Sequence, residues 1–149
     1  MDIAIDFDGT CVTHEFPLIG KDIGAVPVLK KLVKQGHNII LNTMRSDINS
    51  IKYTKLTANE INDNIKGAEG NFLSDAVRWF KNNDIPLYGI NKNPTQNRWT
   101  DSTKVYAQLY IDDSGLGVPL KKDIRISKKL FVDWKKVNIL LENMLVLYL

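Results

Sequence analysis

Short apolar runs alternate along the chain with longer stretches whose apolar residues recur at helical spacing. This alternation is typical of α/β proteins, in which helices cover a parallel sheet. Four of the apolar runs predict strands: Ile3–Phe7, Asn38–Thr43, Pro86–Ile90 and Gln108–Asp112. A weaker fifth strand is expected at Asp123–Ile126. We therefore expect residues 1–149 to form a single three-layer α/β/α domain of Rossmann-like type with a central, mostly parallel sheet.

Three stretches predict helices. Ile23–Gln35 carries apolar residues on one face and stops at Gly36, and Pro27 fits this helix only in its first turn. A second helix is expected at Phe72–Lys81. The third, Lys128–Leu147, has an apolar stripe that includes Phe131, Trp134, Val137 and Leu141, and we expect it to pack on the sheet.

Two polar segments interrupt this pattern. Ser46–Gly70 is rich in asparagine, and we interpret it as a small insertion or lid; Thr57–Glu60 fits a capping box for a short helix that Gly67 would end. Asn91–Thr103 is a long loop that contains Arg98 and Trp99, and loops of this length inside compact domains are often functional. Trp99 either stacks on a base or sugar or lies tucked onto the surface.

The composition narrows the functional class. The chain has a net charge of +3, which suits an anionic ligand but is far below the charge density of a dedicated nucleic-acid binder. Its single cysteine, Cys11, excludes an internal disulfide and a cysteine-rich metal site. Met1 leads directly into a predicted strand without a basic leader, and the apolar run Ile139–Leu149 is too short for a bilayer. We expect a cytoplasmic protein without membrane partners.

The most informative residues follow the first predicted strand. Asp6 and Asp8 lie one residue apart, so a strand of period two directs both carboxylates to the same side. Like charges that close repel each other, and their burial is costly unless a cation shares the site, which predicts a divalent metal. Gly9 permits a sharp turn after the strand, and Thr10 offers a hydroxyl and an N–H group to an anion.

Further polar residues follow the other strands. Thr43 and Arg45 come after the second strand, Asp112 and Asp113 after the fourth, and Lys104 precedes Asp112 by eight residues. Open parallel sheets bind ligands beyond the carboxyl ends of their strands. These residue types support phosphoryl transfer through a carboxyl-phosphate intermediate, in which one aspartate attacks phosphorus and a second carboxyl group transfers protons.

In order and spacing, Asp6-Phe7-Asp8-Gly9-Thr10, Thr43, Lys104 and Asp112-Asp113 resemble the four motifs of the haloacid-dehalogenase (HAD) superfamily. The resemblance implies a Mg²⁺-dependent phosphatase, with Asp6 as nucleophile, Asp8 as general acid and base, and Thr43 and Lys104 as phosphate binders. Gly9, Thr10 and Arg45 would contact the substrate. The metal ligands would come from Asp6, Asp8, Asp112 and Asp113, with Asp113 the direct ligand of its pair and Asp112 orienting Lys104.

The connection from Gly9 to the end of the second strand has room for only one loop and one helix. The chain is thus similar to capless members of the superfamily, such as type C 5′-nucleotidase-like phosphatases. An open site would accept a small phosphomonoester, including a nucleotide, or the phosphate of a nucleic-acid end.

Several alternatives stay open at this point. Lys92 competes with Lys104 as the phosphate-binding lysine, and Arg45 is either a substrate contact or a solvated surface residue. His14 is expected to be a solvent-facing loop residue. The same motifs would also serve a phosphotransferase, or a regulatory protein that binds phosphate and metal without turnover.

Overall fold

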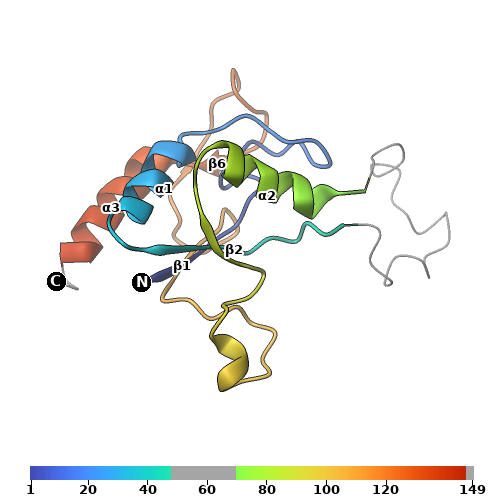
Figure 1. The fold of residues 1–149 in the computed structure, drawn as a ribbon. Coiled ribbons are helices and arrows are strands. Elements are labelled where there is room, and N and C mark those ends of the chain that lie inside the picture. The colour runs from blue at the N-terminus through green and yellow to red at the C-terminus, as the bar shows by residue number, and fades with distance from the viewer. Residues whose placement is uncertain (48–69, 147–149) are drawn as a thin grey trace.

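The computed structural model describes residues 1–47 and 70–146. Its centre is a parallel sheet of four strands in the order β3-β2-β1-β4, so β1 lies between β2 and β4. The strands are β1 (Asp2–Ile5), β2 (Asn38–Leu41), β3 (Leu87–Ile90) and β4 (Leu109–Ile111). Three helices lie together on one side of this sheet, as Figure 1 shows: α1 (Ala25–Lys34), α2 (Phe72–Asn82) and α3 (Trp134–Val146). The predicted α/β class and the parallel sheet are confirmed.

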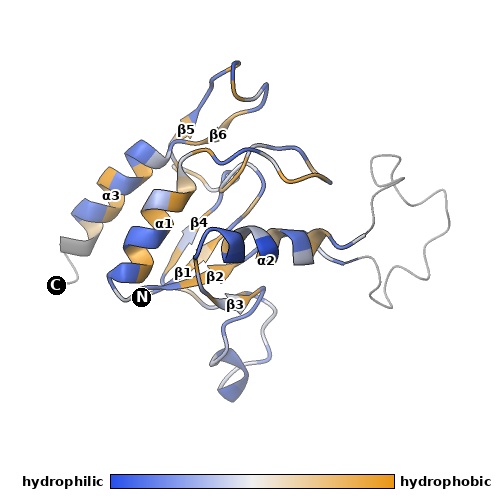
Figure 2. Ribbon diagram, turned by 45° about the horizontal axis from the view of Figure 1, so that its top comes forward, coloured by the Kyte–Doolittle hydropathy of each residue, from blue (hydrophilic) through white to orange (hydrophobic). Residues whose placement is uncertain are grey.

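The central strands β1 and β2 form because their apolar side chains are buried on both faces of the sheet. Ile3 and Ile5 belong to the main core with the inner faces of the three helices, whereas Ala4 packs on the opposite face with Ile40 and Val105. Figure 2 shows the strands mainly in the hydrophobic colour, while the helices carry both colours. The helices are therefore amphipathic covers for one face of a sheet whose two central strands are buried.

The second face is covered differently from the predicted helical layer. Within the described residues, it is segment 91–107 that lies there, with a single 3₁₀ turn, η2 (Gln96–Arg98), below the sheet in Figure 1. Two buried amides hold this segment in place of a helix's own hydrogen bonds. Asn93 Nδ2 donates to Asp2 Oδ2 and to the Tyr106 carbonyl, and Gln96 Nε2 donates to the Ser102 and Lys104 carbonyls.

Two helix starts are fixed by aspartates that the periodicity did not reveal. The Asp22 carboxylate accepts hydrogen bonds from the backbone of residues 24–26, so α1 begins at Ala25 and Pro27 lies in its first turn, as expected. The Asp47 carboxylate accepts from the N–H groups of Leu73 and Ser74 and caps α2 from a distant part of the chain. The expected helix near Thr57 and most of the 46–70 segment lie outside the described residues.

The C-terminal third corrects two predictions. Asp123–Ile126 is a turn closed by hydrogen bonds from Ile126 N and Ser127 N to the Asp123 carbonyl, and the extra strands are the antiparallel pair β5 (Leu120–Lys121) and β6 (Phe131–Val132). The last helix starts at Trp134 rather than Lys128, because Asp133 accepts from Lys136 N and Val137 N at the helix start. Phe131 thus belongs to a strand, whereas Trp134, Val137 and Leu141 face the main core as predicted. No described helix is long and apolar enough to span a membrane.

The buried side chain of Trp134 joins α3 to the loop after β1, because its Nε1–H donates to the Thr10 carbonyl at 2.6 Å. We expect Trp134→Phe to lower the free energy of unfolding by about 1–3 kcal/mol, since this carbonyl would lose a buried donor. Urea denaturation measures the change. Trp99→Phe is the matched control, because Trp99 is 59% exposed and should tolerate the same substitution; equal effects of the two variants would contradict the role of the hydrogen bond.

Candidate active site

The candidate site lies at the topological switch point of the sheet, between β1 and β4. The chain proceeds from β1 to β2 and β3 on one side and then returns to place β4 on the other side of β1. Asp6 directly follows β1, and Asp112 and Asp113 directly follow β4. The Asp6 N–H donates to the Ile111 carbonyl at 3.0 Å, which holds the two strand ends side by side. Such a reversal opens a crevice beyond the carboxyl ends of the strands, where α/β proteins bind ligands.

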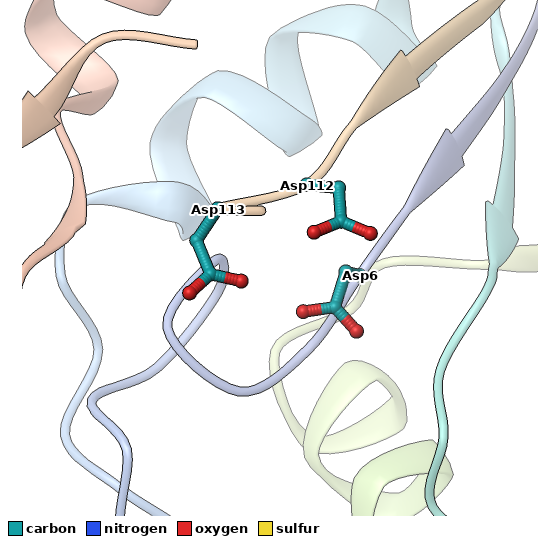
Figure 3. Close-up of side chains that lie close together, drawn as sticks. All are labelled: Asp6, Asp112 and Asp113. Carbon is teal, nitrogen blue, oxygen red and sulfur yellow. The ribbon is translucent and has the colours of Figure 1, made fainter. Parts of the chain in front are cut away.

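Three half-buried carboxylates converge in this place. Asp6, Asp112 and Asp113 each offer an oxygen, and these oxygens lie within 4.8 Å of one another (Figure 3). Burial raises the pKa of Asp6 to about 7 against the opposing effect of the Phe7 N–H; the charge on Asp112 raises it, the Thr10 hydroxyl lowers it and the charge on Asp113 raises it. A donor set made of carboxylate oxygens is the kind that Mg²⁺ prefers, so these three residues fit the predicted metal.

Thr10 and His14 contact the aspartates of the acidic cluster and restrain their positions. The hydroxyl group of the fully buried Thr10 donates to Asp6 Oδ2 at 3.2 Å, and the Thr10 Oγ1 atom accepts a hydrogen bond from the Asp113 N–H at 3.0 Å. His14 Nε2 lies 2.9 Å from Asp113 Oδ2. The predicted substrate contact by Thr10 is therefore wrong, because this side chain is buried and links Asp6 to Asp113. The expectation that His14 faces solvent is also wrong.

Gly9 is required by packing in this loop. Its φ is +81°, and a Cβ atom there would lie 2.1 Å from His14 Nε2 and 2.6 Å from Asp113 Oδ2. Its N–H donates to the Val12 carbonyl at 2.7 Å, so this group of Gly9 is bonded within the loop. In the sequence, the glycine at position 9 was the one sign of close packing in this loop. Nothing in the local pattern of residues indicates that His14 contacts Asp113.

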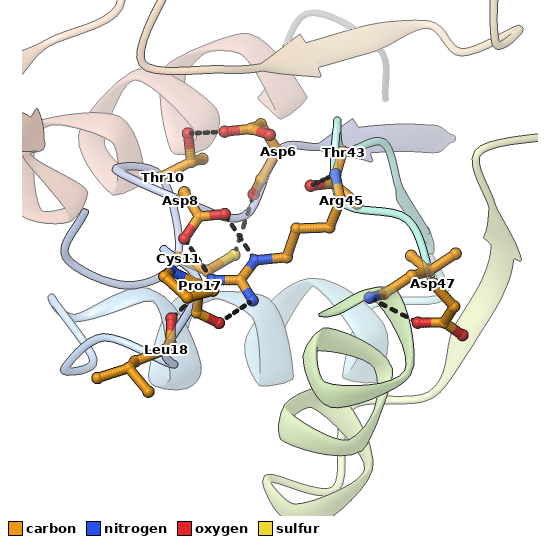
Figure 4. A network of polar contacts seen from close by, with 10 residues as sticks. Asp6, Asp8, Thr10, Cys11, Pro17, Leu18, Thr43, Arg45 and Asp47 are labelled. Carbon is orange, nitrogen blue, oxygen red and sulfur yellow. Dashed lines mark hydrogen bonds and ion pairs between the residues drawn. The ribbon is translucent and has the colours of Figure 1, made fainter. Parts of the chain in front are cut away.

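Asp8 and Arg45 form a pair that the sequence did not predict. Arg45 Nε and one terminal nitrogen donate to the two Asp8 oxygens, each at 2.7 Å, and its terminal nitrogens also reach the Pro17 and Leu18 carbonyls (Figure 4). The guanidinium lies 5.1 Å from the ring centre of Phe7 and 5.2 Å from that of Phe16. Its side chain is 1% exposed.

This pair corrects two predictions. Arg45 is neither a substrate contact nor a solvated surface residue, because its guanidinium is buried and bonded within the protein. Asp8 does not join the acidic cluster, because both of its carboxylate oxygens bind Arg45. Asp6 and Asp8 both follow the end of β1, and a buried arginine, rather than a shared metal, balances the charge of Asp8.

The remaining predicted residues lie around the cluster. Thr43 follows β2 at the same edge of the sheet, where its N–H donates to Asn91 Oδ1 and its hydroxyl accepts from Arg45 N. Lys104 is exposed, and its ammonium lies 5.6 Å from the ring centre of Tyr110, two residues before Asp112. Lys92 follows the edge strand β3, which β2 separates from β1. This placement favours Lys104 over Lys92 as the cation on the side of the cluster.

We expect Arg45→Met to lower the free energy of unfolding by about 3 kcal/mol, because it leaves the Asp8 carboxylate unpaired in a largely buried place. Asp8→Asn in the same protein should restore part of this loss, since it removes the unpaired charge. Urea denaturation of the two single variants and the double variant measures the coupling between the residues. Strictly additive losses would contradict a direct interaction.

The raised pKa of Asp6 predicts a pH-dependent stability. The unfolded chain releases this proton near pH 4 and the folded protein near pH 7, so the contribution of Asp6 is fully present below pH 4 and is lost as the pH rises to about 7. In chelator at pH 8, Asp6→Asn should therefore be more stable than the wild type by up to about 4 kcal/mol, with no difference at low pH. Thermal unfolding from pH 4 to 8 tests this, and a pH-independent difference would contradict it.

Comparison with known proteins supports the fold and gives no functional assignment. A solved structure described as a conserved protein from Bacteroides thetaiotaomicron is similar, with a TM-score of 0.67 and 28% sequence identity over 97% of this chain and 91% of that one. No protein-family model matches the chain, and no curated protein does. The arrangement of strands and helices is thus shared with a protein of nearly the same extent.

Proposed function

We propose that this protein is a Mg²⁺-dependent phosphohydrolase that cleaves a phosphomonoester through an aspartyl-phosphate on Asp6. The observation that carries the proposal is the convergence of the Asp6, Asp112 and Asp113 carboxylates within 4.8 Å at the reversal point of the sheet. The ordered motifs that resemble those of the HAD superfamily support the same reaction. All the residues assigned below belong to the loops after β1, β2 and β4, apart from Lys104, which precedes β4.

Asp6 is the proposed nucleophile. One of its carboxylate oxygens forms a bond to phosphorus, while the bond between phosphorus and the ester oxygen breaks and its electron pair leaves with that oxygen. Water then attacks the phosphorus and releases inorganic phosphate together with the free carboxylate. Asp6, Asp112 and Asp113 would hold Mg²⁺, and a bound Mg²⁺ would supply positive charge that favours the ionised form of Asp6 and offsets the charge of the phosphate.

The other proposed roles use residues at the same edge of the sheet. Thr43 and Lys104 would hold the phosphate oxygens, the first with its hydroxyl and the second with its ammonium. Asp8 would protonate the leaving oxygen and later activate water, which requires its carboxylate to separate from Arg45. His14 and Thr10 position Asp113 and Asp6 without touching the substrate.

The Asp8–Arg45 pair favours a second candidate, a regulatory protein that binds metal and phosphate without turnover. In the described arrangement, the pair occupies the carboxylate that would transfer protons. Hydrolysis requires this carboxylate to be released, whereas binding alone does not.

Purified protein should release phosphate from an aryl phosphate in Mg²⁺ and lose this activity in excess chelator. Asp6→Asn should lower turnover at least about 10³-fold, because the amide is not a nucleophile. Asp84→Asn is the matched control, since this side chain is 88% exposed and lies on the loop after α2.

The outcomes separate the two candidates. Unchanged turnover in Asp6→Asn, or in chelator, would contradict the proposed mechanism. Saturable binding of inorganic phosphate that depends on Mg²⁺, without hydrolysis of any phosphomonoester, would support the regulatory role instead.

A further inference from the structure

The positive charge of the chain is concentrated in one hairpin. Residues 114–130, which we call the basic hairpin, carry a net charge of +4, from one acidic residue, Asp123, and five basic ones: Lys121, Lys122, Arg125, Lys128 and Lys129. The whole chain has a net charge of +3, so its other 132 residues, with 15 basic and 16 acidic side chains, have a net charge of −1. Such an uneven distribution indicates a surface that meets an anionic partner.

The basic side chains of this hairpin are accessible. All five are exposed. Asp123 holds Arg125, whose Nε and one terminal nitrogen donate to the two carboxylate oxygens at 3.0 and 2.9 Å. Within residues 1–47 and 70–146, by contrast, Lys122, Lys128 and Lys129 have no ion pair. Three ammonium groups are therefore available to a partner without the loss of an existing contact.

The hairpin projects from the body of the protein. The β5–β6 pair forms its base, where the Val132 N–H donates to the Gly9 carbonyl at 2.9 Å. The Asp133 N–H donates to the Pro119 carbonyl at 2.8 Å. Residues 122–130 connect the two strands and form the distal end, which extends away from the sheet at the top of Figures 1 and 2. A flat surface can therefore reach this end without meeting the sheet.

Aliphatic side chains accompany the charges at the distal end. Ile124 is 76% exposed and Leu130 is 48% exposed. The hairpin contains no aromatic residue, and its one arginine is held by Asp123. Surfaces that bind single-stranded nucleic acid typically combine cations with aromatic side chains on which bases stack. Lysines beside exposed aliphatic side chains are instead typical of segments that lie at the surface of an anionic membrane.

We propose that the basic hairpin binds the surface of a membrane that contains anionic lipids. Lys122, Lys128 and Lys129 would lie among the negatively charged headgroups. Ile124 and Leu130 would enter the boundary between the headgroups and the acyl chains. Each lysine near such a surface raises the affinity about fivefold, which corresponds to about 1 kcal/mol.

This inference does not depend on the proposed phosphohydrolase activity. It differs from the expectation, drawn from the sequence, that the protein has no membrane partner. That expectation considered only segments able to cross a bilayer, whereas contact with a membrane surface needs no such segment.

Co-sedimentation with lipid vesicles tests the proposal. The wild-type protein should bind vesicles made of equal amounts of phosphatidylcholine and phosphatidylserine, and should not bind vesicles of phosphatidylcholine alone. Added salt should weaken the binding, because it screens the attraction between exposed charges. The triple variant Lys122→Gln, Lys128→Gln and Lys129→Gln should lose roughly 100-fold in affinity for the mixed vesicles.

A second triple variant provides the matched control. Replacement of Lys30, Lys34 and Lys81 by glutamine removes the same charge from exposed positions on α1 and α2, outside the hairpin. It should lose less than about fivefold in affinity, because these lysines are not expected at the membrane surface. Ile124→Ser, which changes no charge, should weaken binding to the mixed vesicles at least about fivefold, since an apolar side chain no longer leaves water. Thermal unfolding of each variant confirms that it is folded.

Three results would overturn the inference. Equal losses in the two triple variants would show that overall charge, rather than the hairpin, attracts the protein to the vesicles. Unchanged vesicle binding in Ile124→Ser would contradict contact of the distal end with the membrane. Saturable binding of single- or double-stranded DNA at protein concentrations at which the mixed vesicles bind none, lost in the hairpin variant, would assign the basic hairpin to nucleic acid instead.

Discussion

The main constraint on this structure is the electrostatic repulsion among Asp6, Asp112 and Asp113, which lie together at one edge of the sheet. Three carboxylates within 4.8 Å repel one another, and burial removes the water that would otherwise solvate them. The raised pKa of Asp6 is the direct consequence of both effects. Because the three aspartates repel one another, contacts with residues outside the cluster must keep them close together.

The loop after β1 supplies that restraint. The Thr10 hydroxyl of this loop donates to the Asp6 carboxylate and accepts from the Asp113 N–H. His14, in the same loop, contacts the Asp113 carboxylate. Trp134 then holds the loop from α3 through the Thr10 carbonyl. The last helix of the chain therefore takes part in positioning the first motif, although 124 residues separate Trp134 from Thr10.

Charge on the other side of the loop is balanced in a different way. The Asp8 carboxylate has a buried arginine partner, and Arg45 also joins the loop by bonding the Pro17 and Leu18 carbonyls. A bidentate arginine pair supplies geometric order as well as opposite charge. The result is one aspartate of the motif in the open acidic cluster and the other in a closed ion pair, which gives the two residues different chemical environments.

Local patterns in the sequence determined the α/β class, the four parallel strands, the faces of the helices and the strand ends at which Asp6, Thr43, Asp112 and Asp113 lie. These features depend on side-chain periodicity and on the common direction of parallel strands, both of which can be followed along the chain. Only the tertiary structure decided that Arg45 pairs with Asp8, that His14 holds Asp113, and that segment 91–107 replaces a helix on the second face. Each of these joins residues that are distant in sequence, or depends on a buried polar side chain whose partner is chosen by packing, and no local periodicity encodes that choice.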